Sequence, residues 1–266
     1  MAAALIGGML RSGFLATQIV AVDPLEEARR RLSSTHAIQT GADATSLVPG
    51  SDLIVLAVKP QHLADVARAL GPLVGAATVL SIAAGIRIVD IGRWLTTNAA
   101  GRVFPLVRAM PNTPALIGMG ITGAYAGGEV GARGRALTTQ VLEAVGQLVW
   151  VQHEQLLDPV TAVSGSGPAY VFYFLEAMQA AGARLGLDPA TAGVLALETF
   201  RGAAELAARS PEDFATLRTR VTSPGGTTER ALQTMMHDAV HEAIGRALDS
   251  ASARAAEMAD QMGRDA

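Results

Sequence analysis

Short apolar runs alternate with helical patterns over the first part of the chain. The runs are rich in Val, Ile and Leu, lack strict alternation, and cover residues 18–23 (QIVAVD), 52–58 (DLIVLAV), 78–85 (TVLSIAAG) and 148–152 (LVWVQ). Such runs are typical of strands buried on both faces of a parallel sheet. Between two of them, HLADVARAL places Leu63, Val66, Ala67 and Leu70 on one face of a helix. This region therefore predicts alternating strands and helices.

The texture changes after His153, where strand-like runs stop. Three long Ala-rich helical patterns follow, at residues 169–185, 189–208 and 228–262. We therefore expect two domains: an α/β Rossmann-like nucleotide-binding domain at residues 1–152 and an all-helical domain at 153–266. Long helices with apolar stripes and few aromatic residues often complete their burial against a second copy. A homodimer or a higher homo-oligomer is the prediction.

Charge and composition exclude several classes of function. The formal net charge is −3 and no long basic run is present, which argues against nucleic acid or an anionic membrane surface as a partner. The apolar runs are shorter than the roughly 20 residues that span a bilayer. The chain has no cysteine, so disulfides and thiolate chemistry are excluded, and we expect a cytoplasmic protein. His237 and His241 have a zinc-like spacing, but no third ligand is apparent, so we expect no metal.

Two loops are candidates for a cofactor site: one follows a strand-like run, and the other contains two prolines. The stretch LAVKPQ would place Lys59 at the carboxyl end of a buried strand, where ligands bind in open parallel sheets, and Pro60 would fix the turn. A surface lysine in an ordinary loop is the alternative. In VRAMPNTPA, two prolines stiffen a loop around the Asn112 amide and the Thr113 hydroxyl. Taken alone, that loop is better explained as an ordinary rigid turn.

The stretch VSGSGPAYVF places a serine between two glycines. The nucleophile turn of α/β-hydrolases needs Gly-x-Ser-x-Gly directly after a strand, whereas Ser164 stands two residues before Ser166 and a helical pattern follows. This spacing argues against a serine nucleophile. We expect a glycine-rich loop that enters a helix near Pro168.

A further loop, TSPGGTTERAL, combines two glycines with three threonines before a helix. Thr227 or Thr228 can cap the helix beginning near Glu229, and exposed N–H groups from Gly225 to Thr228 would carry the positive end of its dipole. Such a loop would hold a small carboxylate. A capped helix without a ligand is the alternative.

Taken in this order and at these distances, LAVKPQ, VRAMPNTPA, VSGSGPAYVF and VTSPGGTTERAL resemble the pyrroline-5-carboxylate reductases, and the resemblance covers nearly the whole chain. It implies reduction of 1-pyrroline-5-carboxylate to L-proline with NADPH or NADH, in the last step of proline biosynthesis. It implies a cofactor site at Ala57, Val58, Lys59, Pro60, Ala84 and Asn112. It also implies a substrate site at Glu154, Ser223, Gly225, Gly226, Thr227 and Thr228, with Thr228 as the catalytic residue.

The front of the chain departs from the family pattern. A dinucleotide-binding unit starts with a strand, a glycine-rich loop and a helix, whereas this chain starts with the helical pattern MAAALIGGML. We therefore expect that the first strand and the phosphate-binding glycines, roughly ten residues, precede Met1 in the natural protein, and that the strand at 18–23 lacks a neighbour. Asp23 at the end of that strand favours NADH, but Pro24 and the nearby Arg29 and Arg30 give a small preference for NADPH.

Two other functions are compatible with parts of this pattern. One is a different imine or hydroxy-acid dehydrogenase with a helical second domain. Such enzymes commonly place a lysine in that domain as general acid or base, and this chain has no lysine after Lys59. The other is a non-catalytic member of the family that only dimerises or binds. Binding of NADPH or NADH would distinguish the two cases, because the non-catalytic protein would not bind either cofactor.

Overall fold

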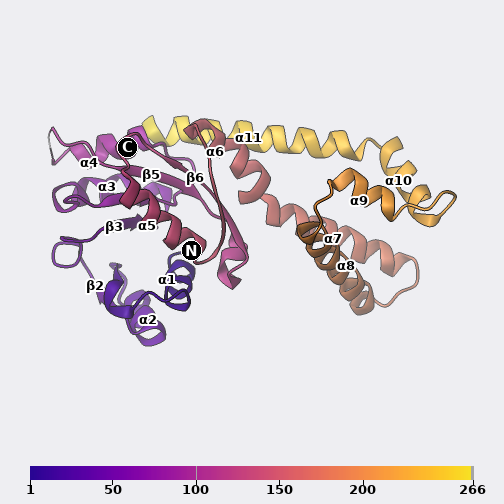
Figure 1. Ribbon diagram of the computed structural model, residues 1–266, viewed down its shortest axis with the longest axis horizontal. Helices are drawn as coiled ribbons and strands as arrows, with labels where there is room; N and C mark the ends of the chain where they lie inside the picture. The colour runs from indigo at the N-terminus through magenta and orange to yellow at the C-terminus, as the bar shows by residue number, and fades with distance from the viewer. Residues whose placement is uncertain (100, 265–266) are drawn as a thin grey trace. The chain divides into compact units, whose positions relative to one another are not determined.

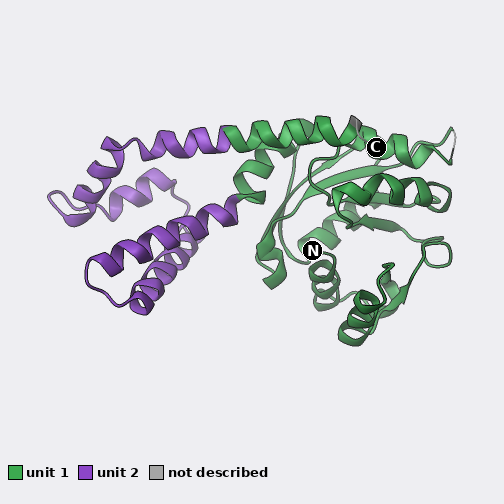
Figure 2. Ribbon diagram, turned by 180° about the vertical axis from the view of Figure 1, so that it is seen from behind, with its two compact units in different colours: residues 1–166, 250–266 green, residues 167–249 purple. Residues whose placement is uncertain are grey.

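The computed structural model describes residues 1–99 and 101–264 (Figure 1). The chain divides into two compact units (Figure 2). Unit 1 contains residues 1–166 and the C-terminal residues from Ser250, and unit 2 is Gly167–Asp249. Each unit is described separately below.

A five-stranded sheet forms the centre of unit 1. Its strands are β3 (Leu53–Leu56), β4 (Thr78–Ser81), β5 (Leu106–Met110), β6 (Gly120–Ala126) and β7 (Gly146–Trp150), in that order across the sheet. β3, β4 and β5 are parallel, whereas β6 runs antiparallel to β5 and parallel to β7. The strands predicted at 52–58, 78–85 and 148–152 are confirmed as β3, β4 and β7. The predicted strands β3 and β4 pair in parallel, as expected, and β7 pairs in parallel with β6; the antiparallel ladder is between β5 and β6, two strands that the sequence pattern did not predict.

A second, two-stranded parallel sheet holds the strand predicted at 18–23. It consists of β1 (Val20–Val22) and β2 (Gln39–Gly41). Within the described part of the chain, β1 pairs with β2 alone and β3 pairs with β4 alone, so each has one open edge. Helix α1 (Ala2–Arg11) contacts both sheets, because Leu5 packs in the core of the large sheet and Ile6 packs beside β1 and β2.

Helices cover both faces of the five-stranded sheet. On one face, α3 (Pro60–Leu70) and α4 (Ile88–Thr96) pack against Val79. On the other, α1 and α5 (Ala132–Glu143) pack against Leu80, the next residue along the same strand. This alternation follows from the two-residue period of a strand and gives the three layers of a doubly wound fold. α2 (Glu26–His36) lies between β1 and β2 in the chain.

The end of the chain also belongs to unit 1. Helix α11 (Val240–Arg264) begins in unit 2 and continues into unit 1, where Ala255 and Ala259 are buried. There the Asp260 carboxylate forms an ion pair with the Arg87 guanidinium, with 2.7 Å between Oδ1 and Nη1.

Residues 153–166 pack onto the sheet of unit 1. They form η4 (Glu154–Leu156), α6 (Leu157–Val160) and the π-helical turn η5 (Thr161–Gly165). The contact is close, because a Cβ atom on Gly123 of β6 would lie 2.5 Å from Val160 Cγ1. The predicted boundary at 152/153 lies shortly after the end of β7 at Trp150, whereas the compact units divide after Ser166.

Unit 2 is entirely helical. It holds α7 (Gly167–Arg184), α8 (Pro189–Arg209), α9 (Phe214–Arg220), α10 (Thr227–His237) and the first part of α11. The single helix predicted over 228–262 is wrong: Ala239 adopts a left-handed conformation with φ of 52° and separates α10 from α11. α9 is a further helix that the sequence pattern did not predict.

Candidate functional site

Three loops of unit 1 meet at one edge of the sheet. The residues Ala57 to Lys59 follow β3, Ala84 follows β4, and Asn112 follows β5. Because these three strands are parallel neighbours, their carboxyl ends lie side by side. This is the edge at which open α/β sheets bind their ligands. The structure therefore brings the residues expected at the cofactor together.

Lys59 and Pro60 form the start of α3. Pro60 is the first residue of the helix, a position where its missing N–H costs nothing, and Lys59 is the extended residue before it. Ala57 and Lys59 are exposed, whereas Val58 packs against the core. The Lys59 ammonium is thus accessible at the sheet edge, beside the positive end of the α3 dipole. A phosphate-bearing cofactor fits this environment.

Asn112 is buried, with 8% of its surface exposed. Its Oδ1 accepts a hydrogen bond from the Ile121 N–H at 3.0 Å, and its Nδ2 donates to the Ser164 carbonyl at 3.2 Å. Asn112 also precedes the short helix η3 (Thr113–Ile117). Both ends of the amide are thus used within unit 1.

The region around β1 bears on the choice of cofactor. Asp23 Oδ1 accepts from the Leu25 N–H at 2.9 Å, so this carboxylate oxygen is turned towards its own loop. The Arg29 guanidinium donates to the carbonyls of Asp23 and Pro24, each at 2.8 Å. Arg30 pairs with Glu26 at 2.5 Å on the exposed side of α2.

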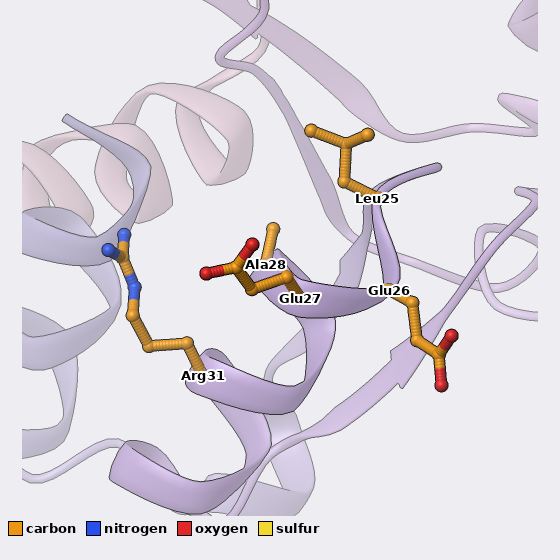
Figure 3. Close-up of a pocket in the computed structure, with 5 residues that line it drawn as sticks. All are labelled: Leu25, Glu26, Glu27, Ala28 and Arg31. Carbon is orange, nitrogen blue, oxygen red and sulfur yellow. The ribbon is translucent and has the colours of Figure 1, made fainter.

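A shallow cavity of about 420 Å³ lies on the first turns of α2, lined by Leu25, Glu26, Glu27, Ala28 and Arg31. Figure 3 shows Glu27 and Arg31 extending on one side of the helix while Glu26 points away. The residues that line this cavity include none of those at the ends of β3, β4 and β5, so it is separate from the site described above.

In unit 2, the loop between α9 and α10 contains the residues expected at the substrate. Gly226 N donates to the Ser223 carbonyl at 3.0 Å, which closes a four-residue turn with Pro224 and Gly225 in its middle. Gly225 has φ of 69°, a conformation that favours glycine, as expected at the third position of a type II turn. Ser223, Thr227 and Thr228 are exposed.

The helix α10 begins at Thr227, two residues earlier than expected. Neither threonine caps it; Gly226 is the N-cap and makes no side-chain cap. Instead, the Glu229 carboxylate accepts from the Gly225 N–H at 2.7 Å. The N–H groups of Gly225 and Gly226 are therefore used within the loop, whereas those of Thr227 and Thr228 belong to the first turn, which has no partners inside the helix.

Glu154 lies in a buried cluster of charges in unit 1. Its Oε1 accepts from the Ile88 N–H at 2.9 Å, at the start of α4, and from Arg108 Nη1 at 3.2 Å. The Arg108 Nη2 atom also lies 3.8 Å from Asp158 Oδ1, which has no hydrogen-bond partner. Burial raises the pKa of the Asp158 carboxyl above its ordinary value, while the Arg108 charge acts in the opposite direction. One oxygen of Glu154 is thus engaged with the protein.

Sequence reasoning did not identify Arg108, Asp158 or the role of Glu229. A charged residue inside an otherwise apolar run, as in LVRAM, is a signal for a buried ion pair, but its partners lie about 50 residues later. His237 ends α10 and His241 lies in α11, so the two do not share a helix. Over residues 1–99 and 101–264, no group of three or more metal-ligating side chains is present. In the same part of the chain, no helix is long and apolar enough to cross a membrane.

Comparison with protein families gives two matches. A model described as pyrroline-5-carboxylate reductase dimerisation matches residues 154–258. A model described as NADP oxidoreductase coenzyme F420-dependent matches residues 1–85. The predicted fold class, a Rossmann-like domain followed by a helical dimerisation domain, is confirmed by these matches.

Similar proteins match over nearly the whole chain. Pyrroline-5-carboxylate reductase of Pseudomonas aeruginosa is 44% identical over 99% of this chain and 95% of its own length. That of Vibrio alginolyticus is 38% identical over 97% of this chain and 94% of its own length. A solved structure of a pyrroline-5-carboxylate reductase from Coxiella burnetii has a TM-score of 0.91 at 33% identity, over 97% of this chain and 94% of its own. The structure of Plasmodium falciparum pyrroline carboxylate reductase with NADP bound has a TM-score of 0.81 at 24% identity, over 96% of this chain and 93% of its own. At this level of identity, the similarity supports the fold alone.

Proposed function

Because the chain belongs to the pyrroline-5-carboxylate reductase family, we propose that it reduces 1-pyrroline-5-carboxylate to L-proline with NADPH or NADH. The observation that carries this proposal is 44% identity over 99% of the chain to a reductase of that name. The loops at the ends of β3, β4 and β5 and the turn before α10 supply the groups that this reaction needs.

The residues at the sheet edge fit a reduced nicotinamide dinucleotide. The exposed Lys59 ammonium attracts a phosphate, Ala57 to Pro60 border the dinucleotide, and Ala84 lines the neighbouring loop. When bound, this cofactor supplies the hydride that converts the C=N bond of the substrate to a C–N bond. The chain lacks lysine beyond Lys59, which disfavours the alternative dehydrogenases that use a lysine in the helical domain.

The turn before α10 recognises the substrate. The N–H groups of Thr227 and Thr228, at the positive end of the α10 dipole, together with the Ser223 hydroxyl, hold the substrate carboxylate. The Thr228 hydroxyl oxygen accepts from the N–H of the protonated imine. A protonated imine is already a good hydride acceptor, and the product amine keeps that proton, so placement of the imine carbon is the main requirement and no strong acid or base is needed.

The cofactor preference follows from the loop after β1. Asp23 is engaged with the Leu25 N–H and so offers one oxygen less to a ribose 2′-hydroxyl. Arg29 is engaged with backbone carbonyls, whereas Arg30 is paired only on an exposed face. These contacts support a small preference for NADPH over NADH. Comparing kcat/KM for the two cofactors measures it.

The helical unit forms a homodimer in this proposal. The dimerisation model covers residues 154–258, and large apolar side chains of α7 and α8 are exposed in the single chain, among them Phe172, Tyr173, Leu195 and Leu197. Light scattering after gel filtration should give at least twice the monomer mass of 27.4 kDa. We further propose a cytoplasmic location, supported by the absence of cysteine; cell fractionation tests it.

The experiment is a kinetic assay with a matched pair of variants. The purified chain should oxidise NADPH or NADH only when 1-pyrroline-5-carboxylate is present. Thr228→Ala should lower turnover by tenfold or more, whereas Thr234→Ala, later in the same helix, should leave it within about twofold. Cofactor binding without turnover of this imine would favour a different dehydrogenase. The absence of cofactor binding would favour a non-catalytic protein.

A further inference from the structure

The carbonyl of Ser164 cannot have its regular helical partner. In an α-helix this carbonyl would accept from the N–H of the residue four positions later, and that residue is Pro168, which has no N–H. The chain here forms the π-helical turn η5 (Thr161–Gly165), in which the Ser166 N–H donates to the Thr161 carbonyl at 2.8 Å. The proline therefore removes one hydrogen bond at the point where the turn meets α7.

Asn112 supplies the donor that Pro168 lacks. Its Nδ2 reaches the Ser164 carbonyl at 3.2 Å, while its Oδ1 accepts from the Ile121 N–H at 3.0 Å. These two partners fix the orientation of the amide, because turning it over would place Nδ2 against an N–H donor and Oδ1 against a carbonyl. The side chain is buried, so neither partner is replaced easily by water.

This bond holds the turn at the ligand edge of the sheet. Asn112 is separated from the end of β5 by Pro111 alone and shares that edge with the loops after β3 and β4. A second close contact secures the same turn, since a Cβ atom on Gly165 would lie 2.6 Å from Met110 Cε. The Ser164–Ser166 turn is thus held against the residues that follow β5, at the edge of the sheet that we propose for the cofactor.

We propose that Asn112 is a positioning residue for the reductase reaction, which acts by holding the Ser164–Ser166 turn through the Ser164 carbonyl. This inference rests on the proposed function. It differs from the sequence-based expectation, in which Asn112 contacts the cofactor directly. A displacement of the turn by about 1 Å would misplace the reacting atoms and lower the rate by up to about a hundredfold.

Asn112→Asp tests the role of the donor. This variant keeps the acceptor for Ile121 but sets an oxygen against the Ser164 carbonyl, so kcat/KM for 1-pyrroline-5-carboxylate should fall at least tenfold. Asn98→Asp is the matched control, because Asn98 Nδ2 also donates to a backbone carbonyl, that of Arg68, at 3.0 Å on an exposed surface. It should change kcat/KM by less than twofold.

Rescue separates positioning from direct contact with the cofactor. Pro168→Ala restores an N–H four residues after Ser164, so Asn112→Asp/Pro168→Ala should recover at least threefold of the loss in kcat/KM. A direct contact with the cofactor would instead raise the KM for NADPH, and Pro168→Ala would not restore it. A raised KM for NADPH that Pro168→Ala does not restore would overturn the proposal. An unchanged kcat/KM in Asn112→Asp would overturn it as well.

Hydrogen exchange gives a readout that does not depend on activity. The Ser166 amide should exchange at least tenfold faster in Asn112→Asp than in the wild type, and slow again in the double variant. Unchanged exchange at Ser166 would overturn the proposal even if activity falls. A wild-type protein that does not reduce 1-pyrroline-5-carboxylate would refute the proposed function, whereas the exchange experiment would still decide whether Asn112 holds the turn.

Discussion

Arg108 on β5 lies in a buried cluster with the two carboxylates of Glu154 and Asp158. Its side chain is 6% exposed, and those of Glu154 and Asp158 are 15% and 11% exposed. At 3.2 Å and an effective dielectric constant of about 20, the attraction to Glu154 is about 5 kcal/mol, and that to Asp158 at 3.8 Å is about 4 kcal/mol. Removal of the charges from water offsets much of this attraction.

Replacement of Arg108 by methionine fills a similar volume but removes the ion-pair partner of Glu154 and the nearer of the two cations that act on Asp158. We expect the free energy of unfolding of unit 1 to fall by about 3–5 kcal/mol. The chain has two tryptophans, Trp94 and Trp150, and both lie in unit 1, so their fluorescence during guanidinium unfolding follows this unit. The midpoint and slope of that transition give the change in stability.

Arg133→Met is the matched control. Arg133 pairs with Asp52 at 2.7 Å, but their side chains are 85% and 61% exposed, so the loss should be about 0–1 kcal/mol. Equal losses for Arg108→Met and Arg133→Met would refute the argument that burial makes the first pair critical.

The pH dependence of the same cluster follows from Asp158. Burial is the main cause that raises its pKa above 3.8, so the folded state retains this proton at a higher pH than the unfolded state does. The stability that the protonated carboxyl contributes is fully present below the unfolded pKa and is lost as the pH rises through the folded pKa. At pH 7 the ionised Asp158 therefore costs stability. Asp158→Asn should stabilise unit 1 at pH 7, and its advantage should shrink as the pH falls towards 4; a constant difference would contradict this reasoning.

Two further predictions concern the substrate turn and the sheet. Glu229→Gln removes a negative charge from the turn that we propose to hold the substrate carboxylate. In steady-state kinetics, the KM for 1-pyrroline-5-carboxylate should therefore fall about two- to fivefold. The control is Glu242→Gln, at the same helical position in α11, which should leave this KM unchanged. Gly123→Ala should destabilise unit 1 by about 1–3 kcal/mol in guanidinium unfolding, because its Cβ would overlap Val160, while Gly128→Ala has free space and should change the stability little.

Strands with uninterrupted apolar runs could be predicted from the sequence, and those with interruptions could not. β3 and β4 are made of Val, Ile, Leu, Thr and Ser, and both faces are covered by helices, so the run itself indicates burial. β5 carries Arg108 in its centre, and β6 contains Gly120 and Gly123, which leave room for close neighbours. Their strand conformation depends on contacts that only the tertiary structure supplies.

The candidate site also contains a part that the sequence predicts and a part that only the tertiary structure reveals. The loop with Lys59 follows a recognisable strand, so its position at the ligand edge could be inferred from the order of elements. The partner of Asn112 could not, because Ser164 is 52 residues away and contributes a backbone carbonyl, which no side-chain pattern reveals. The bond of Glu229 to Gly225 is local, but the expected threonine cap would serve the same purpose, and the sequence alone does not choose between them.

Few side chains of unit 2 are buried in the single chain, and this limits the stability that the unit can have alone. Among its residues, all of which the structure describes, Ala192 and Ala196 alone are buried in the single chain, while Phe172, Tyr173 and Leu197 are exposed. Two buried alanines remove too little apolar surface from water to offset the conformational entropy of five helical segments. Unit 2 by itself thus leaves large apolar side chains in water, and the proposed homodimer, which the Ala-rich stripes with few aromatic residues predict, would bury them and stabilise the unit.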